Sequence, residues 1–265
     1  MNLPRRFSRR VLACLLWSVA LISPASASAP LKALLVTGGC CHDFEAQKKI
    51  LSEGIAARAH VVFDIVHEGT ERTHRLSLYE NVDWAKGYDV VVHNECFGFV
   101  DDPAFVERIV APHAAGVPAV ILHCSSHSYR NTTTDAWRQL VGITSVRHER
   151  RADLLIERLE TPHPVMKGFP PTWFNPQDEL YLNVKVWPNV VPLARSVGVE
   201  SSQPQIVIWT NTHGKARVFA TTLGHHNSTM SDPVYLDLVT RGLLWSVGQL
   251  DDDGKPKPGF GPGGR

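Results

Sequence analysis

The stretch Pro118-Ala-Val-Ile-Leu-His-Cys-Ser-Ser-His127 decides the fold class of this chain. The apolar residues after the proline suit a strand that is buried on both faces, and at His123 the stretch changes abruptly to polar residues and cysteine. In open α/β sheets, ligands bind beyond the carboxyl ends of the parallel strands. The stretch therefore predicts a central strand with a site at its end, whereas an ordinary polar loop is the alternative that these residues alone leave open.

The first half of the sequence repeats a strand–helix pattern. The expected strands cover residues 32–37, 61–66, 88–93 and 118–122, and the expected helices cover residues 43–54 and 103–115. Asp43 suits the start of the first helix, and Asp102-Pro103 suits the start of the second. This order predicts an α/β fold with a mostly parallel sheet and helices on both faces. A flavodoxin-like arrangement would place the first, third and fourth strands side by side.

The second half of the sequence is less regular. Short strands are expected at residues 153–157, 190–195, 205–210 and 216–223, and a final helix is expected from Asp232-Pro233 to about Val247. The segment Pro170–Pro176 is expected to be irregular, because each of its three prolines removes a backbone donor. Gly, Pro, Asp and Lys dominate residues 249–265, so this tail is expected to be disordered.

Residues 1–29 have the composition of a secretory signal peptide. Arginines precede an apolar run from Val11 to Ile22, and small residues with Ala-x-Ala spacing follow. The run is too short and wrongly flanked for a stable membrane span, and Ser8-Arg9-Arg10 resembles a twin-arginine export signal. We therefore expect an exported protein, periplasmic or secreted, with no integral membrane span and with a single domain over residues 30–248.

Charge and cysteine content exclude some functional classes. The signal carries four arginines and no acidic residue, so the rest of the chain has 23 basic and 26 acidic residues, which argues against nucleic acid as a partner. The four remaining cysteines form no Cys-x-x-Cys pair, which excludes a zinc ribbon or a thioredoxin-like motif. A disulfide between Cys96 and either Cys41 or Cys124 is open, as is a homo-oligomer.

Histidines follow several of the predicted strands. Five of them are expected at the same edge of the sheet, namely His42, His123, His127, His225 and His226. Imidazole is the commonest ligand of zinc and similar metals, and three such ligands with an open position make a catalytic site. His42, His123 and His225 are therefore a candidate site for a zinc-like divalent metal, although no tight spacing signature accompanies them.

Several motifs together resemble one family. They are Val36-Thr-Gly-Gly39 with His42-Asp43, Thr161-Pro-His-Pro164 with Lys167-Gly-Phe-Pro170, Asp178-Glu-Leu-Tyr181, the block from Gly214 to His225, Asp232-Pro233 and Gly242-Leu-Leu-Trp245. Over residues 31–248 the chain resembles a ThuA-like (trehalose utilisation) domain. The resemblance implies a flavodoxin-like fold of the class I glutamine amidotransferase-like kind, an association with sugar catabolism, and no glutaminase activity. Leu122-His-Cys-Ser-Ser126 agrees with the last point, because it lacks both glycines of the Gly-x-Cys-x-Gly elbow that amidotransferases of this fold carry.

Histidines and carboxylates at one sheet edge suit proton transfer on a sugar, with or without a metal. The catalytic candidates are Glu95, His123, Asp178 and His225, with Glu179 as an alternative acid or base. The substrate-binding candidates are Gly39, His42, His127, Tyr181 and His226. The resulting prediction is hydrolysis or isomerisation of a carbohydrate or keto-sugar. The alternatives are a non-catalytic carbohydrate-binding or accessory module, and a Cys124 hydrolase of amidotransferase type with His225 as its base.

Overall fold

The computed structural model describes residue 1 and residues 28–264. Nearly all of the predicted signal peptide lies outside the described residues, so export stays a prediction. In the described part of the chain, no helix is both long enough and apolar enough to cross a membrane.

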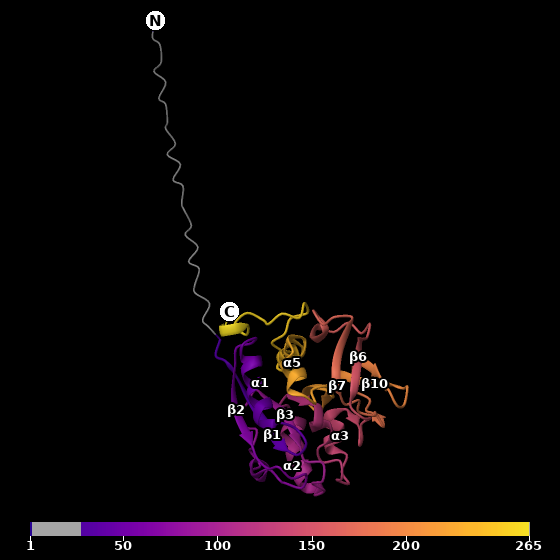
Figure 1. Ribbon diagram of the computed structural model, residues 1–265. Coiled ribbons are helices and arrows are strands. Elements are labelled where there is room, and N and C mark those ends of the chain that lie inside the picture. Colours follow the sequence, from indigo (N-terminus) through magenta and orange to yellow (C-terminus); the bar gives the residue numbers. More distant parts are fainter. Residues whose placement is uncertain (2–27, 265) are drawn as a thin grey trace.

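A nine-stranded sheet forms the centre of the described domain. Its strands lie in the order β2 (Val61–His67), β1 (Leu31–Gly39), β3 (Val90–Cys96), β4 (Ala119–Leu122), β11 (Ala216–Thr221), β10 (Pro204–His213), β9 (Val191–Val197), β6 (Ala152–Arg158) and β7 (Thr172–Asp178). The first five strands are parallel and the last four continue the sheet in antiparallel pairs. In Figure 1 the indigo-to-purple strands β1, β2 and β3 lie on one side of the domain, and the antiparallel strands β6, β7 and β10 lie on the other. The adjacency of β1, β3 and β4 confirms the flavodoxin-like order.

Helices cover both faces of this sheet. On one face α1 (Phe44–Ala56) and α5 (Pro233–Ser246) share a core with strand residues such as Leu35 and Val120. On the other, α2 (Pro103–Ala115) and α3 (Ala136–Val141) share a core with residues such as Leu34 and Ile121. Neighbouring residues of β1 and β4 thus enter opposite cores, as expected for strands buried on both faces. The fold is therefore the predicted α/β arrangement with a flavodoxin-like order of its parallel strands.

Short elements complete the chain. They are the strands β5 (Ile143–Thr144) and β8 (Lys185–Val186), which pair with each other, helix α4 (Asn227–Ser231), and the 3₁₀ turns η1 (Ser77–Glu80), η2 (His123–His127), η3 (Pro164–Met166) and η4 (Pro262–Gly264). The aspartates expected at helix starts accept hydrogen bonds there: Asp43 from the amide of Ala46, Asp102 from those of Ala104 and Phe105, and Asp232 from that of Val234.

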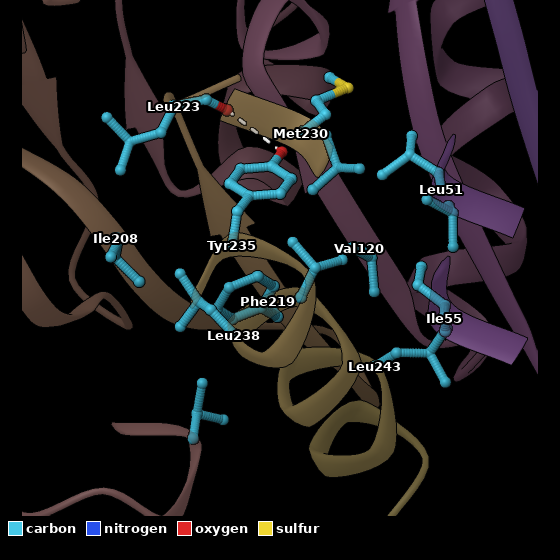
Figure 2. Close-up of a cluster of buried hydrophobic side chains, with 14 of the residues drawn as sticks. Leu51, Ile55, Val120, Ile208, Phe219, Leu223, Met230, Tyr235, Leu238 and Leu243 are labelled. Carbon is cyan, nitrogen blue, oxygen red and sulfur yellow. Dashed lines mark hydrogen bonds between the residues drawn. The ribbon is translucent and has the colours of Figure 1, made fainter. Parts of the chain in front are cut away.

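A buried tyrosine on α5 holds the segment that follows β11. Figure 2 shows the Tyr235 ring among apolar side chains of the core, with its hydroxyl donating to the carbonyl oxygen of Leu223 at 3.2 Å. A polar group in an apolar core is costly unless it is hydrogen-bonded, so this contact fixes the position of the chain at Leu223. Two residues later the chain reaches His225, so the core of the α1–α5 face helps to place a candidate site residue.

Two predictions about irregular segments differ from the structure. The proline-rich segment ends in strand β7, which contains Pro176. β7 is an edge strand, and its pairing with β6 shifts register between Ala152 and Leu154, opposite Pro176, so the missing donor breaks no regular ladder bond. The tail is also ordered: the amide of His60 donates to the carbonyl of Phe260 at 3.0 Å, and the Phe260 ring is partly buried against the core. The tail composition is polar, but a single aromatic ring and backbone hydrogen bonds hold it.

Candidate functional site

Three histidines meet at the carboxyl edge of the parallel strands. His42 follows β1, His123 directly follows β4, and His225 comes shortly after β11. The ring centroids lie 4.7 Å apart for His42 and His123, 4.9 Å for His42 and His225, and 5.5 Å for His123 and His225. The structure therefore brings together the three side chains proposed as metal ligands, from positions nearly two hundred residues apart in the sequence. We call them the three-histidine cluster.

The turn after β4 places His123 in a conformation that most residues avoid. Its φ is +43°, in the left-handed region, which costs a residue with a side chain about 1–2 kcal/mol. In the amidotransferase elbow such a strained turn presents the nucleophile. Here the strained position holds the histidine, and Cys124 is one residue further on. The fold thus uses its sharp strand-to-turn junction to present an imidazole.

Unpartnered nitrogens make the cluster suitable for a metal. Nδ1 of His123 lies 2.7 Å from the carbonyl oxygen of Thr222, which can only accept, so Nδ1 carries the proton and Nε2 keeps its lone pair. That Nε2 atom is buried without a hydrogen-bond partner, as are Nδ1 of His42 and Nδ1 of His225. One potential ligand atom from each of the three residues lies within 4.8 Å of the others. Buried polar atoms without hydrogen-bond partners are rare, and here three of them belong to histidines whose rings pack against one another.

Glu179 adds a carboxylate to the three histidines. Its oxygens lie 3.2 Å from Nδ1 of His225 and 3.6 Å from Nε2 of His123. Zinc binds nitrogen and oxygen at about 2.0–2.2 Å, so two ligand atoms of a tetrahedral ion lie about 3.3 Å apart. The two distances from Glu179 are close to this spacing, and ligand atoms of the three histidines lie within 4.8 Å of one another, so the side chains are near enough to hold a divalent metal such as zinc after small adjustments.

The protonation states suit the same ligand set. Burial, together with His123 and His225, lowers the pKa of His42 to about 3, and burial also lowers the pKa of His123 to about 4. Burial alone would raise the pKa of Glu179, but the neighbouring rings, His225 first, outweigh it and lower the pKa to about 2. At neutral pH these two imidazoles are therefore uncharged with free lone pairs, and the carboxylate is ionised. Those are the forms that bind a metal.

Two cavities meet at His42 and Cys41. The inner cavity, of about 80 Å³, is lined by Cys40, Cys41, His42, Arg72, Cys96, Gly98, Cys124, His127, Arg130, His148, Glu179 and Tyr181. The outer cavity, of about 690 Å³, is lined by Cys41, His42, Asp43, Arg151, His225, His226, Asn227 and Ser228. His42 lines both cavities, His225 lines the outer one, and the ring of His123 packs against both of these histidines, so the three-histidine cluster lies beside the two cavities.

A stack of rings forms one wall of the inner cavity. The Tyr181 ring lies parallel to His127, with centroids 3.8 Å apart, and His148 stacks on the same tyrosine at 5.6 Å. Nε2 of His127 lies 2.8 Å from the Ser145 hydroxyl, which fixes the imidazole. His127 and Tyr181 thus lie at the inner cavity. His226 lines the outer cavity.

The structure places two other predicted residues, Glu95 and Gly39, outside the lining of both cavities. Glu95 is fully buried below the site, 2.9 Å from Nδ1 of His93 and 3.3 Å from the Tyr79 hydroxyl. Gly39 lies where β1 approaches β3, and an added Cβ would come within 2.3 Å of the Cys96 carbonyl oxygen. Both therefore serve the sheet below the cluster and do not contact a ligand in either cavity.

Asp178 holds the backbone segment that carries His225. Its carboxylate is fully buried and accepts hydrogen bonds from the amides of Gly224 at 2.9 Å and His225 at 3.2 Å. Burial raises the pKa of Asp178, and these hydrogen bonds oppose that rise. Asp178 thus fixes the segment that carries His225, while its neighbour Glu179 contacts the three-histidine cluster.

The cysteines are paired as disulfides. Cys96 pairs with Cys124, one of the two partners that the sequence left open, and Cys40 pairs with its neighbour Cys41, which the sequence did not indicate. A disulfide sulfur is not a thiolate, so Cys124 cannot act as a nucleophile in this form. This geometry disfavours the cysteine hydrolase.

Sequence reasoning missed several residues that line the inner cavity. His148 lies 3.6 Å from Glu179, yet it precedes β6, so no strand end marked it. Arg72 and Arg130 lie in loops whose sequence has no periodic signal. Only the folded arrangement reveals that these side chains approach the three-histidine cluster.

Comparison with known proteins identifies the family but leaves the reaction open. Residues 32–246 match the ThuA family, described as "Trehalose utilisation". The structure is similar to a ThuA-like protein from Parabacteroides merdae, with a TM-score of 0.63, 21% identity, and 82% of this chain and 90% of that chain covered. It is also similar to a ThuA-like protein from Bacteroides uniformis, with a TM-score of 0.63, 18% identity, and 88% and 98% covered. No curated protein sequence matches it. Because the family match spans most of the sequence, and a sheet with the expected strand order underlies it, this chain belongs to the ThuA (trehalose utilisation) family.

Proposed function

We propose that this chain is an exported protein that transforms a carbohydrate or keto-sugar, by hydrolysis or isomerisation, with a divalent metal held by His42, His123 and His225. The observation that carries the proposal is the meeting of three histidine side chains, each with a buried ring nitrogen that makes no hydrogen bond, beside the ionised carboxylate of Glu179 and next to two cavities. The sugar is supported by the family description alone.

The residues of the cluster divide the work by their chemistry. His42, His123 and His225 would hold the metal, which when bound would polarise a carbonyl or hydroxyl oxygen of the sugar as a Lewis acid. Glu179 is ionised at neutral pH and accepts a proton from a water molecule or from a sugar carbon or hydroxyl group. Tyr181 and His127 line the inner cavity, and His226 lines the outer cavity. Asp178 keeps the His225 segment in place.

Metal content and turnover together test this proposal. The chain is purified without chelator, its metal is measured by elemental analysis, and disaccharides and their 3-keto forms are screened for products. We expect stoichiometric metal in the parent protein and loss of metal and turnover in His42→Ala and His225→Ala. Glu179→Gln is expected to lower turnover by at least about 100-fold, the usual size of a general-base contribution.

His67→Ala is the matched control. His67 is at the end of β2 and contacts Glu45 rather than the cluster, so this variant is expected to keep metal and turnover. A parent protein that takes up no stoichiometric metal would rule out the metal site. Binding of a sugar without any product would favour the non-catalytic module instead.

A further inference from the structure

We propose that the inner cavity selects a sugar that carries a carboxylate, and that Arg72 and Arg130 bind that carboxylate. This inference rests on the proposed function, because it names the substrate class for the same site. It is independent of the metal, since neither arginine belongs to the three-histidine cluster.

Both arginines face one aromatic ring at the inner cavity. The guanidinium carbon of Arg72 lies 5.3 Å from the centroid of the Phe99 ring, and that of Arg130 lies 5.7 Å from the same centroid. Both side chains line the inner cavity, and Phe99 is 40% exposed. The ring thus gathers two planar cations at one place beside the three-histidine cluster.

Neutral atoms hold these arginines in place. Nε of Arg72 donates to Sγ of Cys40 at 3.2 Å, and Nη2 contacts Sγ of Cys41 at 3.5 Å. Nη1 of Arg130 donates to the carbonyl oxygen of Val146 at 3.3 Å. Sulfur and carbonyl oxygen orient a guanidinium group without cancelling its charge.

Neither arginine has an acidic partner within residues 28–264. Some other arginines in the same range pair with carboxylates, for example Arg75 with Asp102 at 2.8 Å, whereas Arg151 at the outer cavity does not. The planar fork of arginine matches a carboxylate through two parallel hydrogen bonds. The guanidinium groups of Arg72, which is exposed, and Arg130, which is half-buried, are therefore free to receive an anionic group of a ligand at the inner cavity.

A glycine keeps room for this arrangement. A Cβ added at Gly98 would lie 3.2 Å from Nε of Arg130 and 3.3 Å from the His127 carbonyl oxygen. Both contacts are tighter than ordinary van der Waals separation, so a side chain at Gly98 would push Arg130 away from the Phe99 ring. The backbone next to the ring is thus compatible with the observed arginine position only without a side chain.

The charge of the inner cavity favours an anion. Its charged side chains are Arg72, Arg130 and Glu179, and burial followed by the charge of Arg130 lowers the pKa of His127 well below its usual value. Two arginine charges thus face one carboxylate charge in the inner cavity. A volume of about 80 Å³ admits a carboxylate but not a whole sugar ring, so the ring would occupy the outer cavity.

Binding of a matched pair of sugars tests this inference. D-glucuronate and D-glucose differ by a carboxylate in place of a hydroxymethyl group, and their affinities are measured by calorimetry on the EDTA-treated protein at about 0.1 M salt. We expect glucuronate to bind at least about tenfold more tightly, and Arg72→Gln and Arg130→Gln each to reduce that ratio at least about threefold. Arg195→Gln removes the same charge from an arginine that pairs with Glu157 at 3.0 Å, and it is expected to keep the full ratio.

Two results would overturn the inference: equal affinities for both sugars, or a preference for glucuronate that survives in both arginine variants. Displacement of glucuronate by an equal concentration of acetate would show a general anion site and would also contradict it. The failures are distinguishable. If the protein takes up metal but turns over neutral sugars only, the carboxylate site is contradicted and the proposed function is not. If it prefers glucuronate but binds no metal, the proposed function is contradicted and the carboxylate site is not.

Discussion

Single residues at the site combine an unusual backbone position with a free ring nitrogen. The left-handed φ of His123 and the hydrogen bond of its Nδ1 to Thr222 together aim Nε2 at the cluster. Asn tolerates left-handed φ better than other residues with side chains, so it can occupy this turn without an imidazole. His123 is therefore the position where backbone and metal requirements can be separated.

We predict that His123→Asn lowers metal affinity by more than about 100-fold, because it removes one of three ligands, while outer-shell changes cost about 10–100-fold. Its unfolding free energy in EDTA should fall by no more than about 2 kcal/mol. Competition with a chelating dye and urea unfolding measure these quantities. His127→Asn, in the same turn but outside the cluster, serves as the control and should keep the metal. Equal metal affinity in His123→Asn and the parent would contradict the ligand assignment.

The residue types at strand ends predicted the three-histidine cluster, but they did not predict which carboxylate lies beside it. His42, His123 and His225 follow apolar strands, and strand ends of a parallel sheet meet at one edge. The sequence analysis favours Asp178 as the catalytic carboxylate with Glu179 as the alternative, but it is Glu179 that lies beside His123 and His225. The choice depends on an irregular strand end in which Gln177 has a φ of +53°. Such a local twist decides which carboxylate is buried and which one reaches the site.

Elements below the site are joined by a buried polar contact. Nε2 of His113 on α2 lies 3.1 Å from Nε2 of His93 on β3, and Nδ1 of His113 lies 2.7 Å from the Val117 carbonyl oxygen. Burial, and then the neighbouring His93, lower the pKa of His113 from 6.5 to about 3. The docking of α2 onto the sheet therefore depends on His113 remaining uncharged.

This contact predicts acid sensitivity with a definite sign. Below pH 6.5 the unfolded chain protonates His113, but the folded chain does so only near pH 3, so its contribution to stability is lost as the pH falls from 6.5 towards 3. Between pH 7 and pH 5 the loss from this group is about 2 kcal/mol. Urea unfolding at both pH values should show a pH-dependent loss about 2 kcal/mol smaller in His113→Gln than in the parent. Identical losses would show that His113 is not the group responsible.

At the scale of the whole molecule, the tail shows where composition misleads. Residues 249–264 are rich in Gly, Pro, Asp and Lys, yet they cross from the end of α5 to the side where β2 and the start of β1 lie (Figure 1). Composition predicts disorder because such a segment cannot build a core of its own. Composition does not predict that Phe260 packs against a core formed by other elements. Long-range packing of this kind is visible only in the assembled fold.

The Phe260 ring accordingly holds the tail against the domain, and its removal should lower the unfolding free energy of the whole domain. Fully burying a phenylalanine contributes about 1.5–3 kcal/mol, and Phe260 is partly buried, so we predict that Phe260→Ala lowers the unfolding free energy by about 1–2 kcal/mol. For a domain of this size that loss corresponds to a Tm lower by about 2–8 °C, measurable by calorimetry. Phe174→Ala provides the matched control, because Phe174 is 59% exposed on the edge strand β7 and should change Tm by much less. If both variants melted at the parent's temperature, the tail would lie against the domain without stabilising it, and the ordered segment would have no energetic role.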